Sequence, residues 1–134
     1  MNFHHIGLAV SNIQEELKHY RSIGAVKVSP IYDDKIQNVK IVFFELGGIR
    51  HELVAPLTTG SPVDKFLKKK IRLYHTCFEV LNIEKESVMF KKTGALVILP
   101  PTKAIALENR LVTFLLTPFG DLIELLESKS ESKT

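Results

Sequence analysis

The chain repeats a segment of its own sequence, and this repeat constrains the fold more than any other feature. At an offset of 70 residues, positions 5–30 and 75–100 share eight identities in 26 aligned positions, where unrelated sequences of ordinary composition share about two. In the first copy the identical residues are His5, Val10, Asn12, Ile13, Glu16, Gly24, Ala25 and Pro30. The sequence therefore predicts two copies of one module, each beginning with a strand that carries a histidine.

The first copy predicts a strand, a helix and three further strands. Residues 3–10 alternate in character, which places His5 on one face with the small residues Gly7 and Ala9. We therefore expect space beside the histidine. The elements that follow are a helix capped by the Ser11–Asn12 pair and running to about Ser22, a short strand at 26–28, a polar loop at 32–38, and a hairpin of 39–46 with 49–55.

The second copy follows a proline-containing linker, 56–62, and a short basic helix, 63–70. Its predicted elements are a strand at 72–80, a helix at 82–93, a strand at 95–99, a long loop through Pro100 and Pro101 to Glu108, and a hairpin of 111–116 with 122–126. We expect one domain, 1–127, with modules at about 3–55 and 71–127, and a disordered tail at 128–134.

The predicted fold class is α+β, with two paired βαβββ modules forming a cupped mixed sheet. Three strands after each helix favour this arrangement over the alternative, a duplicated ferredoxin-like domain.

Composition and charge limit the partners that we expect. Hydrophobic residues make up 45% of the 134 residues and charged residues 25%, which is typical of a soluble protein. No apolar run approaches the roughly 18 residues that span a membrane, and no signal peptide is visible. The single cysteine, Cys77, fits a reducing cytoplasm. The net charge of +3 is far from the basic face of a nucleic-acid binder. We expect a cytoplasmic protein without nucleic-acid or membrane partners.

Each module also places one glutamate on its last strand. At an offset of 72, Glu52 aligns with Glu124, and Glu124 interrupts an otherwise apolar strand. A carboxylate there costs free energy unless it is paired or bound to a metal. If the modules pack with pseudo-twofold symmetry, these glutamates converge with His5 and His75. Two imidazoles and two carboxylates suit one divalent ion, Ni, Co, Zn, Mn or Fe(II), with positions left for water or substrate.

An alternative explanation assigns these four residues no metal. A histidine on a strand is more often a packing or surface residue, and a glutamate near a strand end is often solvated. The same duplicated scaffold can then bind a small molecule without a metal.

Four segments resemble the vicinal oxygen chelate superfamily, in particular its glyoxalase I and methylmalonyl-CoA epimerase branch. They are HHIGLAVSNI, ELVAPLTTGSPVDKFL, YHTCFEVLNIE and TPFGDLIELLE. The resemblance implies paired βαβββ modules, metal ligands at His5, Glu52, His75 and Glu124, and a homodimer. It also implies that a metal-bound glutamate, Glu124 before Glu52, is the base that removes a proton next to a carbonyl.

From this resemblance we predict a glyoxalase I-like lyase of the lactoylglutathione lyase type, acting on a small-molecule thiol conjugate. A single base suffices for that reaction, and Lys40 occupies the position where some epimerases have a second carboxylate. However, Gly7–Ala9 lacks the arginine with which glyoxalase I holds glutathione. The alternatives are a methylmalonyl-CoA epimerase-like isomerase acting on an acyl thioester, a metal-free antibiotic-binding protein and, third, a ring-cleaving dioxygenase. Arg110, Lys40 and Cys77 are the predicted substrate contacts.

Overall fold

The computed structural model describes residues 1–129 and divides the chain into two compact units. The first unit is His5–Tyr74, and the second comprises Met1–His4 with the chain from His75 onward. The first strand, β1 (Asn2–Ala9), therefore begins in the second unit and ends in the first.

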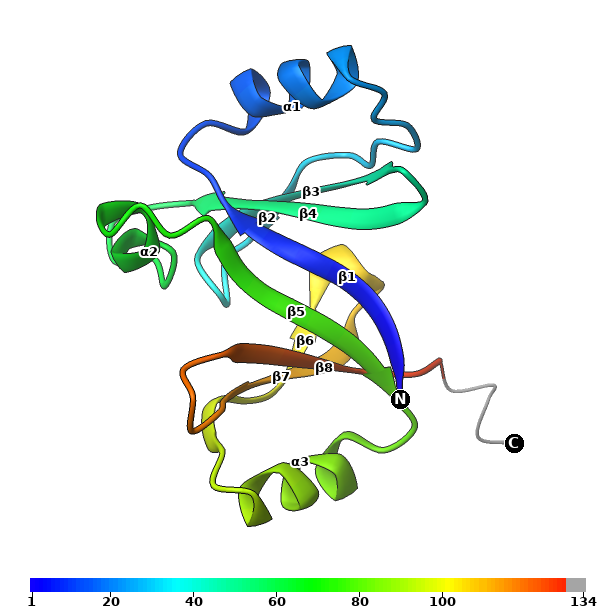
Figure 1. Cartoon of the computed structure of the whole chain (residues 1–134), viewed down its shortest axis with the longest axis vertical. Coiled ribbons are helices and arrows are strands. Elements are labelled where there is room, and N and C mark those ends of the chain that lie inside the picture. Colours follow the sequence, from blue (N-terminus) through cyan, green and yellow to red (C-terminus); the bar gives the residue numbers. More distant parts are fainter. Residues whose placement is uncertain (130–134) are drawn as a thin grey trace. The chain divides into compact units, whose positions relative to one another are not determined.

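The first unit carries a four-stranded mixed sheet with one long helix over it (Figure 1). The strand order is β2-β3-β4-β1, in which β3 is antiparallel to both its neighbours and β1 is parallel to β4. After β1 the elements are α1 (Ile13–Ser22), β2 (Tyr32–Asp34), β3 (Val39–Leu46), β4 (Ile49–Pro56) and α2 (Asp64–Lys68).

The second unit repeats this order in four further strands, β5-β8-β7-β6, with α3 over them (Figure 1). Here β5 is parallel to β8, and β7 is antiparallel to β8 and β6. The elements are β5 (Leu73–Val80), α3 (Ile83–Lys92), β6 (Leu96–Ala104), the 3₁₀ turn η1 (Ile105–Leu107), β7 (Arg110–Leu116) and β8 (Leu122–Glu127). The repeat in the sequence is thus a repeat of strand order and direction.

The two long helices begin and end alike because the repeated residues carry the signals. The side chain of Asn12 accepts a hydrogen bond from the Glu15 N–H at 3.0 Å, and that of Asn82 accepts one from Lys85 at 3.0 Å. Each helix then packs against its own sheet through one apolar stripe. The buried clusters are Val10, Ile13, Leu17, Val42, Phe44, Leu53 and Ala55 in the first unit, and Val80, Ile83, Ala95, Leu115 and Leu125 in the second.

Replacing either capping asparagine with alanine is expected to destabilise the protein by about 1 kcal/mol, because one N–H of the first turn loses its acceptor. Thermal unfolding of Asn12→Ala and Asn82→Ala measures both losses. Similar decreases in Tm are expected, since both caps have the same geometry. A negligible decrease for one variant alone would show that the two helix starts are not equivalent.

Two predicted strands are wrong in their placement. No strand forms at 26–28, where Val26 makes only an isolated bridge to Glu45 and Lys27 has a φ of 53° that interrupts an extended chain. The strand instead forms at Tyr32–Asp34, within the predicted loop. In the second module, β6 continues through Pro100 and Pro101, with a register shift between Leu99 and Thr102. An edge strand tolerates proline because one side of it needs no N–H donors.

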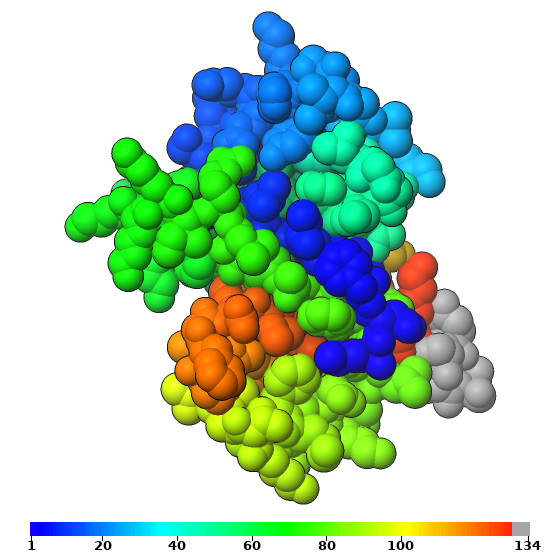
Figure 2. Space-filling view, viewed as in Figure 1, coloured from blue at the N-terminus to red at the C-terminus, as the bar shows by residue number. Residues whose placement is uncertain are grey.

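The turn between β7 and β8 lies at the surface, in orange in Figure 2. Its backbone closes through the Thr117 N–H, which donates to the Asp121 carbonyl at 2.9 Å, and Phe119 at its tip is 94% exposed. Of the predicted disordered tail, positions 130–134 lie outside the described residues, and the Ser128 N–H donates to the Val80 carbonyl at 2.8 Å. The helices within residues 1–129 are all too short or too polar to cross a membrane.

Candidate functional site

The first unit holds a buried histidine–glutamate pair. The parallel register sets Gly7 of β1 beside Glu52 of β4, and His5 lies two residues earlier on the same face of β1. The His5 Nε2 atom is 3.4 Å from the Glu52 Oε1 atom, and the two residues are 0% and 3% exposed. Because side chains alternate between the two faces of a strand, the sequence pattern places the side chains of His5 and Glu52 on the same face of the sheet.

An aromatic ring orients this imidazole. Phe43 on β3 is the cross-strand neighbour of Glu52 on its other side. Its ring meets the His5 ring edge to face, with centroids 5.2 Å apart and an interplanar angle of 78°. Such a contact favours one ring orientation, and here the imidazole keeps Nε2 toward the carboxylate.

The second unit holds the same arrangement. Cys77 of β5 lies beside Glu124 of β8, and His75 lies two residues before Cys77. The His75 Nε2 atom is 3.1 Å from the Glu124 Oε1 atom, with exposures of 2% and 3%. Phe114 on β7 is opposite Glu124, and its ring meets the His75 ring at 5.1 Å and 89°.

The predicted histidines and glutamates are thus brought together within each unit. Sequence reasoning missed the two phenylalanines, because phenylalanine in a strand is a core residue by default. The sequence nevertheless carried a signal for them. Phe43 and Phe114 are 71 residues apart, a spacing between the offset of 70 for the histidines and that of 72 for the glutamates. An aromatic residue opposite each glutamate therefore belongs to the repeat.

The donor set of each pair fits a divalent metal ion. Histidine nitrogen and carboxylate oxygen bind such ions at about 2.0–2.2 Å, so neighbouring ligand atoms on one ion lie roughly 3.0–3.5 Å apart. The observed separations of 3.4 and 3.1 Å lie in this range. A buried carboxylate next to an imidazole is costly to desolvate, and a bound cation would offset that cost.

Two of the predicted substrate contacts are engaged with acidic partners. The Arg110 Nη1 atom donates to the Glu79 carboxylate at 2.6 Å, and the Arg110 side chain is only 13% exposed. The Lys40 ammonium lies 3.3 Å from Asp33 on the neighbouring strand, as an exposed cross-strand pair. A role in substrate binding stays a prediction for both residues.

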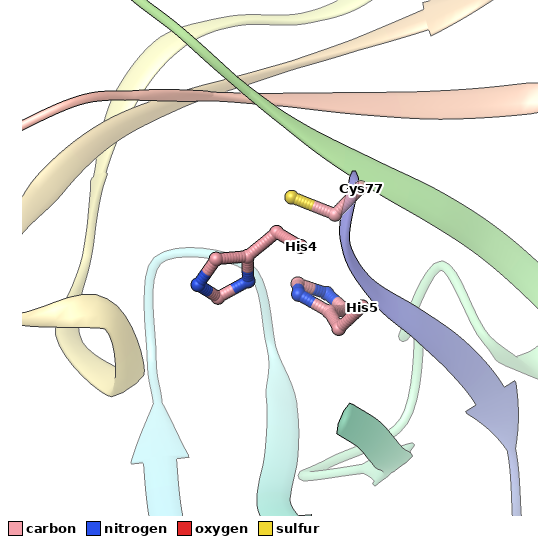
Figure 3. A group of neighbouring side chains, drawn as sticks. All are labelled: His4, His5 and Cys77. Atoms are coloured by element: carbon pink, nitrogen blue, oxygen red, sulfur yellow. The ribbon is translucent and has the colours of Figure 1, made fainter. Parts of the chain in front are cut away.

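Cys77, the third predicted contact, is fully buried beside Glu124. A ring nitrogen of His4 lies within 4.8 Å of its sulfur, and Figure 3 shows the two side chains as neighbours. Cys77 thus lies on the His75 face of β5, and its contact with a substrate stays a prediction.

Several known proteins resemble about two thirds of the chain or more. Mitochondrial methylmalonyl-CoA epimerase of Dictyostelium discoideum is 31% identical over 127 residues, which cover 92% of this chain and 76% of that protein. The ethylmalonyl-CoA/methylmalonyl-CoA epimerase of Cereibacter sphaeroides is 29% identical over 113 residues, 83% of this chain and 84% of that protein. The mouse mitochondrial methylmalonyl-CoA epimerase is 32% identical over 90 residues. These residues cover 66% of this chain and 51% of the mouse protein, so the match spans about half of the mouse protein's length.

Solved structures share the fold. A hypothetical protein of Bacillus halodurans C-125 superposes with a TM-score of 0.82 at 31% identity, covering 96% of this chain and 95% of that one. Methylmalonyl-CoA epimerase of Mycobacterium tuberculosis superposes with a TM-score of 0.81 at 20% identity, covering 98% and 91%. The predicted α+β fold of two βαβββ modules is therefore confirmed.

These relatives overturn the predicted activity. They are methylmalonyl-CoA epimerases, which are isomerases, so the prediction of a glyoxalase I-like lyase is wrong, and the thiol conjugate predicted as its substrate loses its support. That prediction rested on a single base being sufficient and on Lys40 standing where a second carboxylate is expected, whereas the similarity to epimerases extends over most of the chain. The family model for the Glyoxalase/Bleomycin resistance protein/Dioxygenase superfamily matches residues 4–114, and the chain belongs to this superfamily.

Proposed function

We propose that this protein is an isomerase that epimerises C2 of a 2-substituted malonyl-CoA such as methylmalonyl-CoA. The observation that supports this proposal most is the buried histidine–glutamate pair in each module. The chain that carries these pairs is 31% identical, over 127 residues, to a methylmalonyl-CoA epimerase. The hydrogen on C2 is acidic because its conjugate base is delocalised into the thioester carbonyl. The reaction therefore needs a base and a stabiliser of negative charge on the thioester oxygen.

The two glutamates supply the bases in this proposal. Inversion at C2 requires that a proton leaves one face of the carbon and returns to the other, which two carboxylates can share. We assign removal of the proton in one direction to Glu124 and its return to Glu52, with the roles exchanged in the reverse direction. His75 and His5 hold the two carboxylates in place, since each lies within 3.1–3.4 Å of its own glutamate.

We further propose that His5, Glu52, His75 and Glu124 together hold one divalent ion, Ni, Co, Zn or Mn. The nitrogen–oxygen separations within the pairs, 3.4 and 3.1 Å, support this, because they lie in the range of neighbouring ligands on one ion. When bound, the ion supplies Lewis-acid stabilisation to the charge that develops on the thioester oxygen. The expected homodimer and cytoplasmic location stay predictions.

Deuterium exchange tests the proposed reaction. In D₂O, the protein is expected to exchange the C2 hydrogen of methylmalonyl-CoA, followed by ¹H NMR, at a rate proportional to protein concentration. A single pure epimer should become a mixture of both in the same sample. The hemithioacetal of methylglyoxal and glutathione serves as the comparison substrate, from which no lactoylglutathione is expected. Lactoylglutathione formation without C2 exchange would contradict the proposal.

A further inference from the structure

The second unit contains an open pocket of about 480 Å³ at the start of α3. This volume lies within the roughly 300–1,000 Å³ of small-molecule sites. The lining includes Met1, Asn2, Glu79, Leu81, Glu86 and Ser128. Glu86 is half-buried, and its carboxylate makes no ion pair or hydrogen bond with any of residues 1–129. The pocket therefore presents a partly desolvated negative charge that the described chain leaves unbalanced.

The repeat shows what the first unit holds at the corresponding place. At the offset of 70, Glu86 corresponds to Glu16 on α1, and Asn2 corresponds to Arg72. The Arg72 guanidinium donates to both carboxylate oxygens of Glu16, one of them at 2.9 Å, and to the carbonyl of Ala9 at 3.2 Å. The hydrogen bond to Glu16 raises the pKa of Arg72 above its ordinary value. In the first unit, this glutamate is thus the partner of a guanidinium.

The second unit keeps the glutamate but has no guanidinium of its own at this place. Asn2 is short and uncharged where Arg72 is long and cationic, and Met1 makes no ion pair within the described residues. Glu79 corresponds to Ala9, and its carboxylate is already bound by Arg110 at 2.6 Å. Among the described residues, the carboxylate of Glu86 therefore remains without a cation.

We propose that this pocket binds an alkylguanidinium group through Glu86. A guanidinium is planar and presents paired N–H donors, so it matches a carboxylate in the two-bond geometry that Arg72 and Glu16 display. The group can belong to a free guanidino compound or to an arginine of a polypeptide. Because the site is half-exposed, binding is expected to be weak, with a dissociation constant of roughly 1–10 mM, and sensitive to salt.

Agmatine titrations followed by ¹⁵N NMR test the site. In wild-type protein at low salt, we expect saturable shifts of the Leu81 and Glu86 amides. Glu86→Gln should weaken binding at least fivefold, whereas Glu84→Gln, which neutralises an exposed glutamate on the same helix, should change it less than twofold. Tetramethylammonium, a cation without N–H donors, should not bind. Equal affinities for wild type and Glu86→Gln, no saturation by 50 mM agmatine, or equal shifts with tetramethylammonium would each overturn the proposal.

A second variant restores the missing guanidinium. Asn2→Arg is expected to raise Tm by about 2–4 °C and to abolish agmatine binding, whereas Asn2→Gln should do neither. An Asn2→Arg protein that binds agmatine with wild-type affinity would contradict the assignment. Acetyl-Gly-Arg-Gly-amide distinguishes the two sources of the group. Binding as tight as that of agmatine indicates an arginine of a polypeptide, and binding of agmatine alone indicates a free compound.

Discussion

Replacing Glu124 with glutamine is expected to slow C2 exchange of methylmalonyl-CoA by roughly 10²–10⁴-fold, the contribution typical of a positioned general base. Glutamine keeps the size of the side chain and an oxygen that can face the His75 imidazole, 3.1 Å away in the wild type. It cannot accept the substrate proton. The initial rate of exchange in D₂O, at saturating substrate, measures the loss as a change in kcat.

Glu84→Gln is the control for this prediction, because it removes an exposed carboxylate from the same unit. Its exchange rate should remain within twofold of wild type. Thermal unfolding of both variants separates a catalytic loss from a loss of folded protein. If folded Glu124→Gln exchanges C2 at the wild-type rate, Glu124 is not the base.

Removal of bound metal is expected to have the second largest effect. Dialysis against a strong chelator should slow C2 exchange at least 100-fold, because the thioester oxygen loses its Lewis acid. The protein should remain folded, since both pairs lie in sheets whose cores contain no metal ligand. Addition of Co, Ni, Zn or Mn, followed by the same exchange assay, should restore activity.

The matched control for metal removal is dialysis of the same protein against the same buffer without chelator, which should leave the rate unchanged. If metal-depleted protein retained its full exchange rate, the carboxylates alone would perform the reaction. The proposed role of the ion would then be abandoned, while the base assigned to Glu124 would stand.

Sequence reasoning located the two pairs because every signal involved was local. Strand alternation puts His5 and His75 on the faces that meet Glu52 and Glu124, and the repeat identifies the partners. Short strands depend instead on tertiary pairing. Tyr32–Asp34 becomes a strand because β3 offers an edge to it, and no pattern within those three residues predicts that.

The activity was beyond what the residues alone could fix. The lyase prediction treated Lys40 as a missing base, but Lys40 lies at the surface beside Asp33. A single aligned position carries little information about a reaction, whereas similarity to epimerases over 127 residues integrates many positions. The phenylalanines opposite the glutamates were missed because phenylalanine in a strand is taken as a core residue by default, although their spacing follows the repeat.

The proposed reaction depends most on both pairs binding one shared ion, and the metal stoichiometry tests this directly. Elemental analysis of protein reconstituted with cobalt and freed of excess metal should give one ion per chain for wild type. His5→Ala and His75→Ala, which each disable one pair, should both retain well under 0.1 ion per chain, while His19→Ala, at an exposed histidine, retains one. Two ions per wild-type chain, or full occupancy in either pair variant, would contradict the account.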